Sequence, residues 1–391
     1  MKFTVSSLIR QVHFPPISEV QGWLRDCQAA APKPLFDLCQ AVPDYPPAKE
    51  LVEYLQSRLT DPTVSRYSPD EGLPEVRDAI CQHYRQRYVA CIEPNQLCLS
   101  IGASQAFWLA MMVSCREGDE VIVQTPYYFD HAMALQGLGI EARLTPFVEE
   151  RCGLPDPVTI AAMITPRTRA ILLVSPSNPT GTVCPPELLE ELYQMAKANG
   201  LALILDETYR AFLSGDAPPH DLFQREDWGD HFVHLASFGK TYALTGYRAG
   251  MLAASASFIH EALKVQDTMA VCQPRITQLA VAYGVEHLAS WVESNRALMQ
   301  QRHDCFVKEF DRPGNAFKLV SSGAFFAWVR HPFAGQSGRQ VTRTLVEKAG
   351  LLVLPGEVFG PGLENYLRLA FGNIRAEDIP AAIDRFCQIH P

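Results

Sequence analysis

Five short apolar runs alternate with longer segments of helical pattern, and this alternation restricts the fold more than any other feature of the sequence. Each run is rich in aliphatic and β-branched residues, as in strands that are buried on both faces. Buried strands joined by helices form a mostly parallel sheet, and ligands of such sheets bind at the carboxyl ends of the strands. The runs are 120–126, 169–177, 201–208, 231–238 and 249–255.

The remaining segments predict a second, smaller lobe. Segment 185–200 is typical of a connecting helix, with proline at its start and glycine at its end. The last hundred or so residues differ, since they combine long helices near 286–310 with a few short strands. We therefore predict an α/β fold: a three-layer α/β/α large domain at 46–285 and a smaller α+β domain at 286–391. Residues 1–45 lack the strand–helix rhythm and are expected to join the smaller domain.

Charge and composition exclude several classes of function. The chain has 391 residues and a net charge of -9, so nucleic acid and anionic membrane surfaces would repel it on average. Its N-terminus has no apolar run of signal-peptide length, and no segment approaches 18 unbroken apolar residues. We expect a cytoplasmic protein with no nucleic-acid or membrane partner.

The cysteines and histidines do not predict a metal site. The 11 cysteines are odd in number and scattered, without a CxxC pair, which indicates neither a disulfide framework nor a zinc ribbon. The 11 histidines include no HExxH pattern. His231 and His234 stand three apart in a predicted strand and should face opposite sides of the sheet. No metal is expected.

Two polar residues stand where predicted strands end. Asp206 closes the run LALILDET, and Tyr209 follows it three residues later. Asn178 follows another strand, inside a turn that Pro179 and Gly181 favour. Taken singly, the aspartate is readily explained as a helix cap and the asparagine as a turn residue.

A possible anion site involves two further segments. LSIGASQAFWLAMM passes from a strand through Gly102 into a helix whose first turn exposes backbone N–H groups, unless Ser104 only caps that helix. In SFGKTYALTGYRAG, Lys240 and Arg248 stand eight residues apart without an acid between them. If Ser237, Arg248 and the helix start converge on one phosphate, Lys240 stands beside that anion.

A lysine, a buried acid, polar donors and a phosphate cradle together meet the requirements of a pyridoxal phosphate site. The chain resembles the class I/II aminotransferase family, which belongs to the fold-type I pyridoxal phosphate-dependent enzymes. The resemblance is collinear over residues 67–368, and the ordered set of motifs is far more specific than any one of them. The motifs are RYSPDEGLPEVR, GASQA, TPYY, NPTG, DETY, SFGK, GYRAG and LRLAFG.

The resemblance implies roles around the cofactor ring. Lys240 is expected to form the Schiff base with the cofactor and then to transfer the substrate proton. Asp206 is expected to keep the pyridine nitrogen protonated, because an ion pair favours both charged forms. Asn178 and Tyr209 would donate hydrogen bonds to the phenolic oxygen, and Tyr128 would stack on the ring.

The resemblance also implies how the phosphate is bound. Ala103 and Ser104 at the helix start, together with Ser237 and Arg248, would contact the phosphate. Tyr67 resembles the tyrosine that family members extend to the phosphate of a partner subunit. A homodimer with shared sites is therefore expected, although Tyr67 in a turn is equally explained by packing on its own core.

Arg368, in the motif YLRLAFG, resembles the arginine that holds the substrate α-carboxylate. Asn178 and the backbone at Ala41 would complete this contact. A salt bridge to a protein acid is the alternative for Arg368, since an unpaired charge in an apolar strand costs several kcal/mol. Two positions depart from the family pattern: Ala41 stands where many relatives have glycine, and Gly239 stands where many have a hydroxyl residue.

The resemblance predicts an aminotransferase that moves an amino group from an L-amino acid to 2-oxoglutarate or another 2-oxo acid. A neutral or aromatic donor is favoured, because no second arginine is assigned to the site; Arg275 is as readily a surface residue. Four aromatic residues would form an apolar wall: Phe14, Trp23, Tyr128 and Phe129. The alternatives are a C–S β-lyase built on the same residues and, with less support, a regulator module that binds the cofactor without catalysis.

Overall fold

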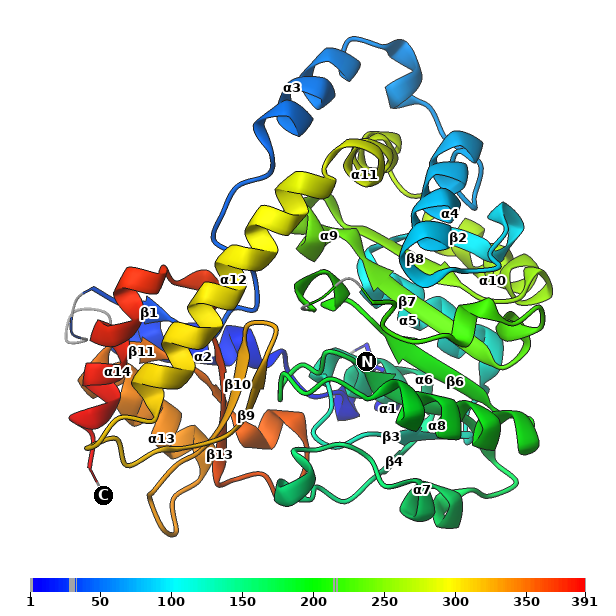
Figure 1. Cartoon of the computed structure of the whole chain (residues 1–391). Helices are drawn as coiled ribbons and strands as arrows, with labels where there is room; N and C mark the ends of the chain where they lie inside the picture. Colours follow the sequence, from blue (N-terminus) through cyan, green and yellow to red (C-terminus); the bar gives the residue numbers. More distant parts are fainter. Residues whose placement is uncertain (1–2, 28–31, 33, 214, 216, 391) are drawn as a thin grey trace.

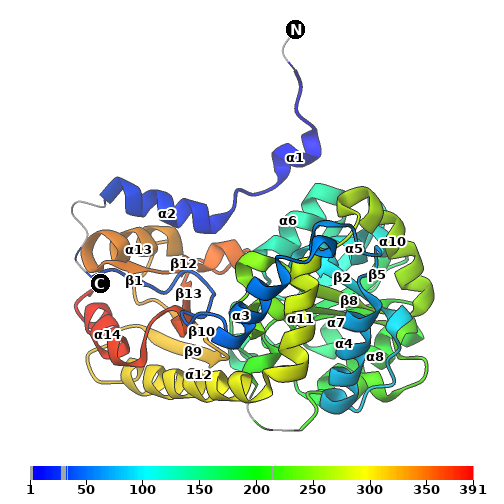
Figure 2. The ribbon, with the colours of Figure 1, turned by 90° about the horizontal axis from the view of Figure 1, so that it is seen from above.

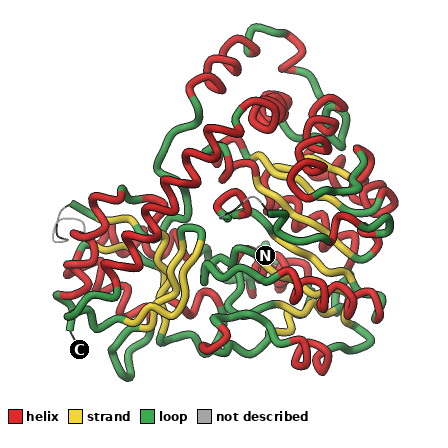
Figure 3. Tube along the Cα trace, in the orientation of Figure 1, coloured by secondary structure: helices red, strands yellow, loops and turns green. Residues whose placement is uncertain are grey.

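The computed structural model describes residues 3–27, 32, 34–213, 215 and 217–390, and these form two lobes (Figure 1). The larger lobe surrounds a seven-stranded sheet, and the smaller lobe contains a four-stranded antiparallel sheet. Helices enclose the strands of both lobes (Figure 3). The α/β fold expected from the sequence is confirmed.

The central sheet contains all five predicted strands. Its strand order is β2-β8-β7-β6-β5-β3-β4, and its pairings are parallel except for those that β8 makes with β2 and β7. Since β8 alone is reversed, it begins at the edge of the sheet where the other strands end. The strands are β2 (Leu97–Ile101), β3 (Glu120–Val123), β4 (Glu141–Leu144), β5 (Thr168–Val174), β6 (Ala202–Asp206), β7 (Phe232–Ser237) and β8 (Ala249–Ala253).

Helices cover both faces of this sheet, as the apolar strands require. Alternating strand residues point to opposite faces, so Leu203 and Leu205 belong to one buried cluster and Ile204 to another. The first cluster includes residues of α3, α4, α8 and α11, and the second includes residues of α5, α6 and α10. The larger lobe has the helices α3 (Lys49–Arg58), α4 (Pro74–Tyr88), α5 (Gly102–Ser114), α6 (Phe129–Leu138), α7 (Pro157–Met163), α8 (Pro186–Ala198), α9 (Phe238–Thr241), α10 (Ala256–Ala270) and α11 (Arg275–His287).

The predicted helix at 185–200 is α8. Proline occupies its first position, and Gly200 follows its end with a φ of +64°, a left-handed conformation that glycine adopts readily.

The smaller lobe joins the two ends of the chain. β1 (Phe36–Asp37) pairs in parallel with β11 (Leu351–Leu352), and α2 (Pro16–Cys27) lies beside α13 (Figure 2). These contacts agree with the predicted division at residues 45/46 and 285/286, which stays a prediction. The other elements are β9 (Lys318–Gly323), β10 (Phe326–Arg330), β12 (Leu354–Pro355), β13 (Tyr366–Ala370), α12 (Ala289–Phe310), α13 (Gly338–Thr344) and α14 (Ile379–Cys387); α1 (Ser7–Gln11) precedes them and contacts α6.

The described part of the chain shows neither a membrane-spanning helix nor a metal-binding cluster. None of its helices has both the length and the apolar character that crossing a membrane requires. Nor does this part of the chain bring three or more His, Cys, Asp or Glu side chains together in a metal-binding arrangement.

Candidate active site

A cavity of about 180 Å³ lies at the edge of the central sheet where the parallel strands end. Residues that follow β2, β3, β5, β6 and β7 line it, as do Arg248 just before β8 and Arg368 of the smaller lobe. All of the predicted site residues except Tyr67 are in this lining: Ala41, Ala103, Ser104, Tyr128, Asn178, Asp206, Tyr209, Ser237, Lys240, Arg248 and Arg368.

The start of α5 and Arg248 form a cradle at one end of the cavity. A Cβ atom on Gly102 would lie 2.5 Å from Arg248 Nη2, and one on Gly250 would lie 2.4 Å from the carbonyl carbon of Gly102. Only glycine therefore lets the guanidinium approach the helix start this closely. The first turn of α5 contains no acidic residue, so its unpaired N–H groups and Arg248 together favour an anion.

Asp206 is a buried acid that stays ionised. Its Oδ2 lies 3.2 Å from His131 Nε2, and its Oδ1 accepts a hydrogen bond of 2.9 Å from the Thr208 N–H. Burial alone would raise the pKa of Asp206, but the contacts with His131 and Thr208 outweigh it and lower the pKa. The carboxylate is thus ready to pair with a cation in the cavity.

His131 is a site residue that the sequence analysis missed. It lies on α6 three residues after Tyr128, and its ring packs at a tilt against Phe107 with centroids 4.2 Å apart. Tyr128 is the residue just before α6, and its ring lies 5.3 Å from that of His131, so the three-residue spacing is the signal that could have linked them.

Lys240 lies on the short helix α9 and points into the cavity. Its Nζ donates a hydrogen bond of 2.7 Å to the carbonyl oxygen of Ala41. Burial, together with the positive charges of Arg248 and Arg368, lowers the pKa of Lys240 to about 8. A considerable fraction of this amine is therefore neutral and nucleophilic near physiological pH.

Gly239, before this lysine, has room for a side chain. A Cβ atom there would meet Leu244 O and Ser237 Oγ at 3.4 Å, which is ordinary contact. Packing therefore does not explain why glycine, and not a residue with a hydroxyl group, stands at position 239.

Arg368 enters the cavity from β13, where it pairs in register with Trp328 of β10 and Leu354 of β12. It is 1% exposed, donates to Asn178 Oδ1 at 3.2 Å and to the Cys39 carbonyl oxygen, and leaves its Nε without a partner. Among the described residues no carboxylate forms an ion pair with it. The predicted alternative, a salt bridge to a protein acid, is absent there, and the buried charge suits a carboxylate ligand.

Two tyrosines form further walls of the cavity. The Tyr128 hydroxyl donates to Asp130 Oδ2 at 2.6 Å, and burial raises the pKa of Tyr128. The Tyr209 ring packs edge-on against Phe325 and Phe326. Burial raises its pKa as well, so both hydroxyls keep their protons.

Some residues considered for the site from the sequence lie outside the cavity lining: Tyr67, Arg275, Phe14 and Trp23. Tyr67 is 78% exposed, and its carbonyl oxygen accepts a hydrogen bond of 2.9 Å from Arg275 Nη2. Phe14 lines a neighbouring cavity instead, and Trp23 packs against a buried cluster that α2 shares with the rest of the smaller lobe. In the expected apolar wall, Tyr128 and Phe129 are joined by Ile17.

Comparison with known proteins agrees with this arrangement. The family "Aminotransferase class I and II" matches residues 33–386. An aromatic aminotransferase of Arabidopsis thaliana is 30% identical over 94% of this chain and 92% of its own length. An aspartate aminotransferase of Pyrococcus abyssi is 28% identical over 91% of this chain and 92% of its own length. The solved structure of a Thermus thermophilus aspartate aminotransferase double mutant superposes with a TM-score of 0.89 at 26% identity, covering 99% of this chain and all of that one.

The residues of the cavity fit pyridoxal phosphate, the cofactor of this family. The glycine-lined cradle beside Arg248 suits its phosphate, the neutral amine of Lys240 suits its aldehyde, and the ionised Asp206 suits its pyridinium nitrogen. The chain belongs to the class I and II aminotransferase family and is a pyridoxal phosphate-dependent aminotransferase.

Proposed function

We propose that this aminotransferase takes its amino group from a neutral or aromatic L-amino acid and passes it to 2-oxoglutarate or another 2-oxo acid. The composition of the cavity lining is the observation that carries this proposal. Its described lysine and arginine residues are Lys240, Arg248 and Arg368, each of which has a task in binding the cofactor or the α-carboxylate. Ile17, Val42 and Phe129 offer apolar contact to a substrate side chain instead.

The residues at the ring divide the chemistry among them. When bound, pyridoxal phosphate supplies a protonated ring that takes up the electron pair left by the broken Cα–H bond. Asp206, oriented by His131, would hold the proton on the ring nitrogen. Asn178 and Tyr209 would donate to the phenolic oxygen, and Tyr128 would pack on the ring face. Lys240 would tether the cofactor, and its amine, once released, would accept the proton from the substrate Cα.

The lowered pKa of Lys240 predicts how the apo chain reacts with pyridoxal phosphate. Only the neutral amine is nucleophilic, so the rate of cofactor incorporation should rise with pH through a midpoint of about 8. Since Arg368 is one of the charges that lower this pKa, the variant Arg368→Leu should shift the midpoint upward. Stopped-flow absorbance across a pH series measures both midpoints. An unchanged midpoint in the variant would contradict the electrostatic explanation.

Arg368 should govern the affinity for amino acids. With Asn178 and the backbone at Ala41, it would hold the α-carboxylate so that the Cα–H bond stands perpendicular to the ring, where orientation selects which bond breaks. We expect Arg368→Leu to lower kcat/KM by roughly 100-fold, the loss of about 3 kcal/mol from one charge-assisted contact.

The matched test for Arg368 compares an amino acid with the amine that lacks its carboxylate. Wild-type enzyme should prefer the amino acid strongly, and Arg368→Leu should lose most of that preference. Absorbance titration of the cofactor with both ligands measures the two affinities. A preference that survives in the variant would assign the carboxylate to another residue.

The phosphate end of the site would be shared between two subunits. Ala103, Ser104, Ser237 and Arg248 would bind the phosphate from one chain, and Tyr67 would reach it from the partner of a homodimer. The exposure of Tyr67, 78% in the single chain, supports this role, because an aromatic ring so exposed is available to a partner.

Hybrid dimers test the shared site directly. Tyr67→Ala and Lys240→Ala homodimers each carry two damaged sites, but a mixed dimer has one site with Lys240 from one subunit and Tyr67 from the other. We expect the purified mixed dimer to bind cofactor at that site with wild-type affinity and to have about half of the wild-type activity; an equilibrated equal mixture, in which about half of the dimers are mixed, should recover about a quarter. If Tyr67 acts within its own subunit, mixing should restore nothing, and sedimentation velocity would show whether a dimer forms at all.

A product assay separates amino transfer from the β-lyase alternative. The purified protein is incubated with a cystathionine-like donor, and with aromatic donors, in the presence and absence of 2-oxoglutarate. Formation of glutamate that requires 2-oxoglutarate supports the proposal. Release of pyruvate and ammonia without any acceptor would favour the lyase, and the absence of both reactions would favour the regulator module.

A further inference from the structure

Glu207 stands between two residues of the active site but faces away from the cavity. Side chains alternate in direction at the end of a strand, so Asp206 points toward His131 on one face of the sheet and Glu207 points toward the other. Glu207 is 2% exposed and is not part of the cavity lining. Its carboxylate therefore has no direct contact with substrate or cofactor.

Three donors from three separate parts of the chain hold this carboxylate. Glu207 Oε2 accepts hydrogen bonds from His234 Nε2 on β7 at 2.8 Å, from the Tyr88 hydroxyl on α4 at 2.8 Å and from His220 Nε2 at 3.2 Å. Burial alone would raise the pKa of Glu207, but His220 and His234 hold it well below its usual value. The group is thus a buried anion at neutral pH.

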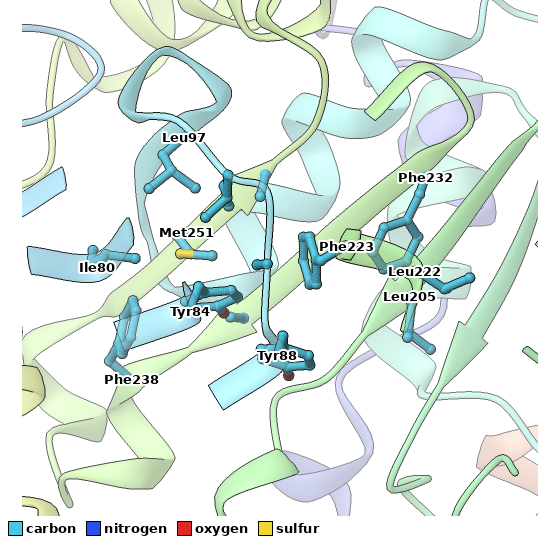
Figure 4. Packing of buried hydrophobic residues seen from close by; sticks show 14 of the residues in the cluster. Ile80, Tyr84, Tyr88, Leu97, Leu205, Leu222, Phe223, Phe232, Phe238 and Met251 are labelled. Atoms are coloured by element: carbon cyan, nitrogen blue, oxygen red, sulfur yellow. The ribbon is translucent and has the colours of Figure 1, made fainter. Parts of the chain in front are cut away.

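Arg210 supplies the counter-charge. Its Nη1 lies 3.4 Å from the Tyr88 hydroxyl, and its guanidinium sits 4.6 Å from the centre of the Tyr84 ring. Tyr84 and Tyr88 pack in turn against Phe223 within one buried cluster of the larger lobe (Figure 4). The carboxylate is consequently fixed within a rigid aromatic cluster, in which low polarity strengthens each of its hydrogen bonds.

Glu207 lies at the point where the backbone pairing between β6 and β7 ends. The Glu207 N–H still bonds to Leu235 O of β7 at 2.9 Å, and the chain then turns into the segment that carries Tyr209. We propose that Glu207 is a positioning residue for amino transfer: held from three elements, it fixes the backbone between Asp206 and Tyr209 and so aims both side chains at the cofactor. The proposal rests on the roles proposed above for Asp206 and Tyr209.

The variant Glu207→Gln tests the proposal in the holoenzyme. The amide keeps the size of the side chain but replaces the anion that three donors share. Because small displacements of catalytic groups are costly, we expect kcat to fall about 10- to 100-fold. The KM for the amino donor should change less, since Arg368 is untouched. The pH midpoint of the bound cofactor's absorbance should shift, as Asp206 no longer meets the ring nitrogen correctly.

Glu120→Gln is the matched control. Glu120 is also fully buried in the central sheet, where it pairs with Arg143 and Arg167, but it lies at the start of β3, at the opposite edge from the cavity. Both variants should lower the melting temperature, and only Glu207→Gln should shift the absorbance midpoint. Equal midpoints in the two variants, or a wild-type kcat in Glu207→Gln, would overturn the proposal.

Two further variants keep the test decisive. Tyr88→Phe removes one donor without changing the charge of Glu207. It should therefore shift the absorbance midpoint in the same direction as Glu207→Gln, by a smaller amount. If Glu207→Gln does not fold, a wild-type midpoint in Tyr88→Phe overturns the proposal.

Asp206→Asn reports on the proposed function itself. If it leaves the midpoint unchanged, the role of Asp206 is wrong, whereas a shift in Asp206→Asn but not in Glu207→Gln rejects only the role of Glu207.

Discussion

Replacing Lys240 with alanine should abolish covalent attachment of pyridoxal phosphate and lower amino transfer by a factor on the order of 10⁵ or more. In the proposed mechanism the variant would lose the tether and the base together, because one amine, Lys240 Nζ, lies in the cavity and is assigned both tasks. The visible absorbance of the covalently bound cofactor should be missing, and borohydride should no longer fix the cofactor to the chain. Mass spectrometry of the reduced protein measures that attachment.

Lys264→Ala is the control for this variant. Lys264 lies on α10, is exposed and pairs with Glu261 at 2.7 Å, so its loss should change neither absorbance nor rate. Full turnover in Lys240→Ala would remove the basis of the mechanism proposed above.

Asp206→Asn should produce the second-largest loss, a fall in kcat of about 10³-fold, which corresponds to about 4 kcal/mol of transition-state stabilisation. Asparagine has no negative charge to balance a protonated ring nitrogen, and its amide replaces one of the two oxygens that contact His131 and Thr208. Since the pKa of Asp206 is below its usual value, the loss should be present throughout the neutral pH range. Single-turnover kinetics with saturating donor isolates the proton-transfer step.

Asp119→Asn provides the comparison for a buried aspartate without contact to the cavity. Asp119 is 5% exposed and pairs with Arg169 at 3.1 Å just before β3 begins. The variant Asp119→Asn should be less stable than the wild-type protein but should keep the wild-type rate of proton transfer. Similar rates in the two variants would show that burial, and not contact with the cofactor, explains the effect.

The sequence predicted five strands of the central sheet because each of these is largely apolar on both faces, whereas the edge strand β4, which contains Glu141 and Arg143, was not among them. Ile204 and its neighbours Leu203 and Leu205 leave no polar side, so their segment fits only between two helical layers. The reversal of β8 was not predicted, since an antiparallel strand that is buried on both faces has the same composition as a parallel one.

Site residues at the ends of strands could be predicted from the sequence, whereas site residues on other elements were harder to predict. Asp206 ends its strand, and Asn178 follows another strand closely. His131, by contrast, contacts Asp206 from a helix 75 positions earlier in the sequence, and local sequence patterns do not encode so distant a contact. Ile17 likewise enters the cavity from the N-terminal segment, through packing of α2. The placement of Tyr67 depends on a second chain and stays a prediction.

The reversal of β8 also has a consequence for the size of cofactor that the proposed site could hold. Lys240 follows β7 and Arg248 precedes β8, and these two strands are paired as far as Ser237 and Gly250. In the proposed site, the aldehyde end and the phosphate end of the cofactor would therefore both be held by one antiparallel strand pair. We expect a vitamin B6 analogue with one additional methylene in its phosphate arm to reach only one of these two contacts.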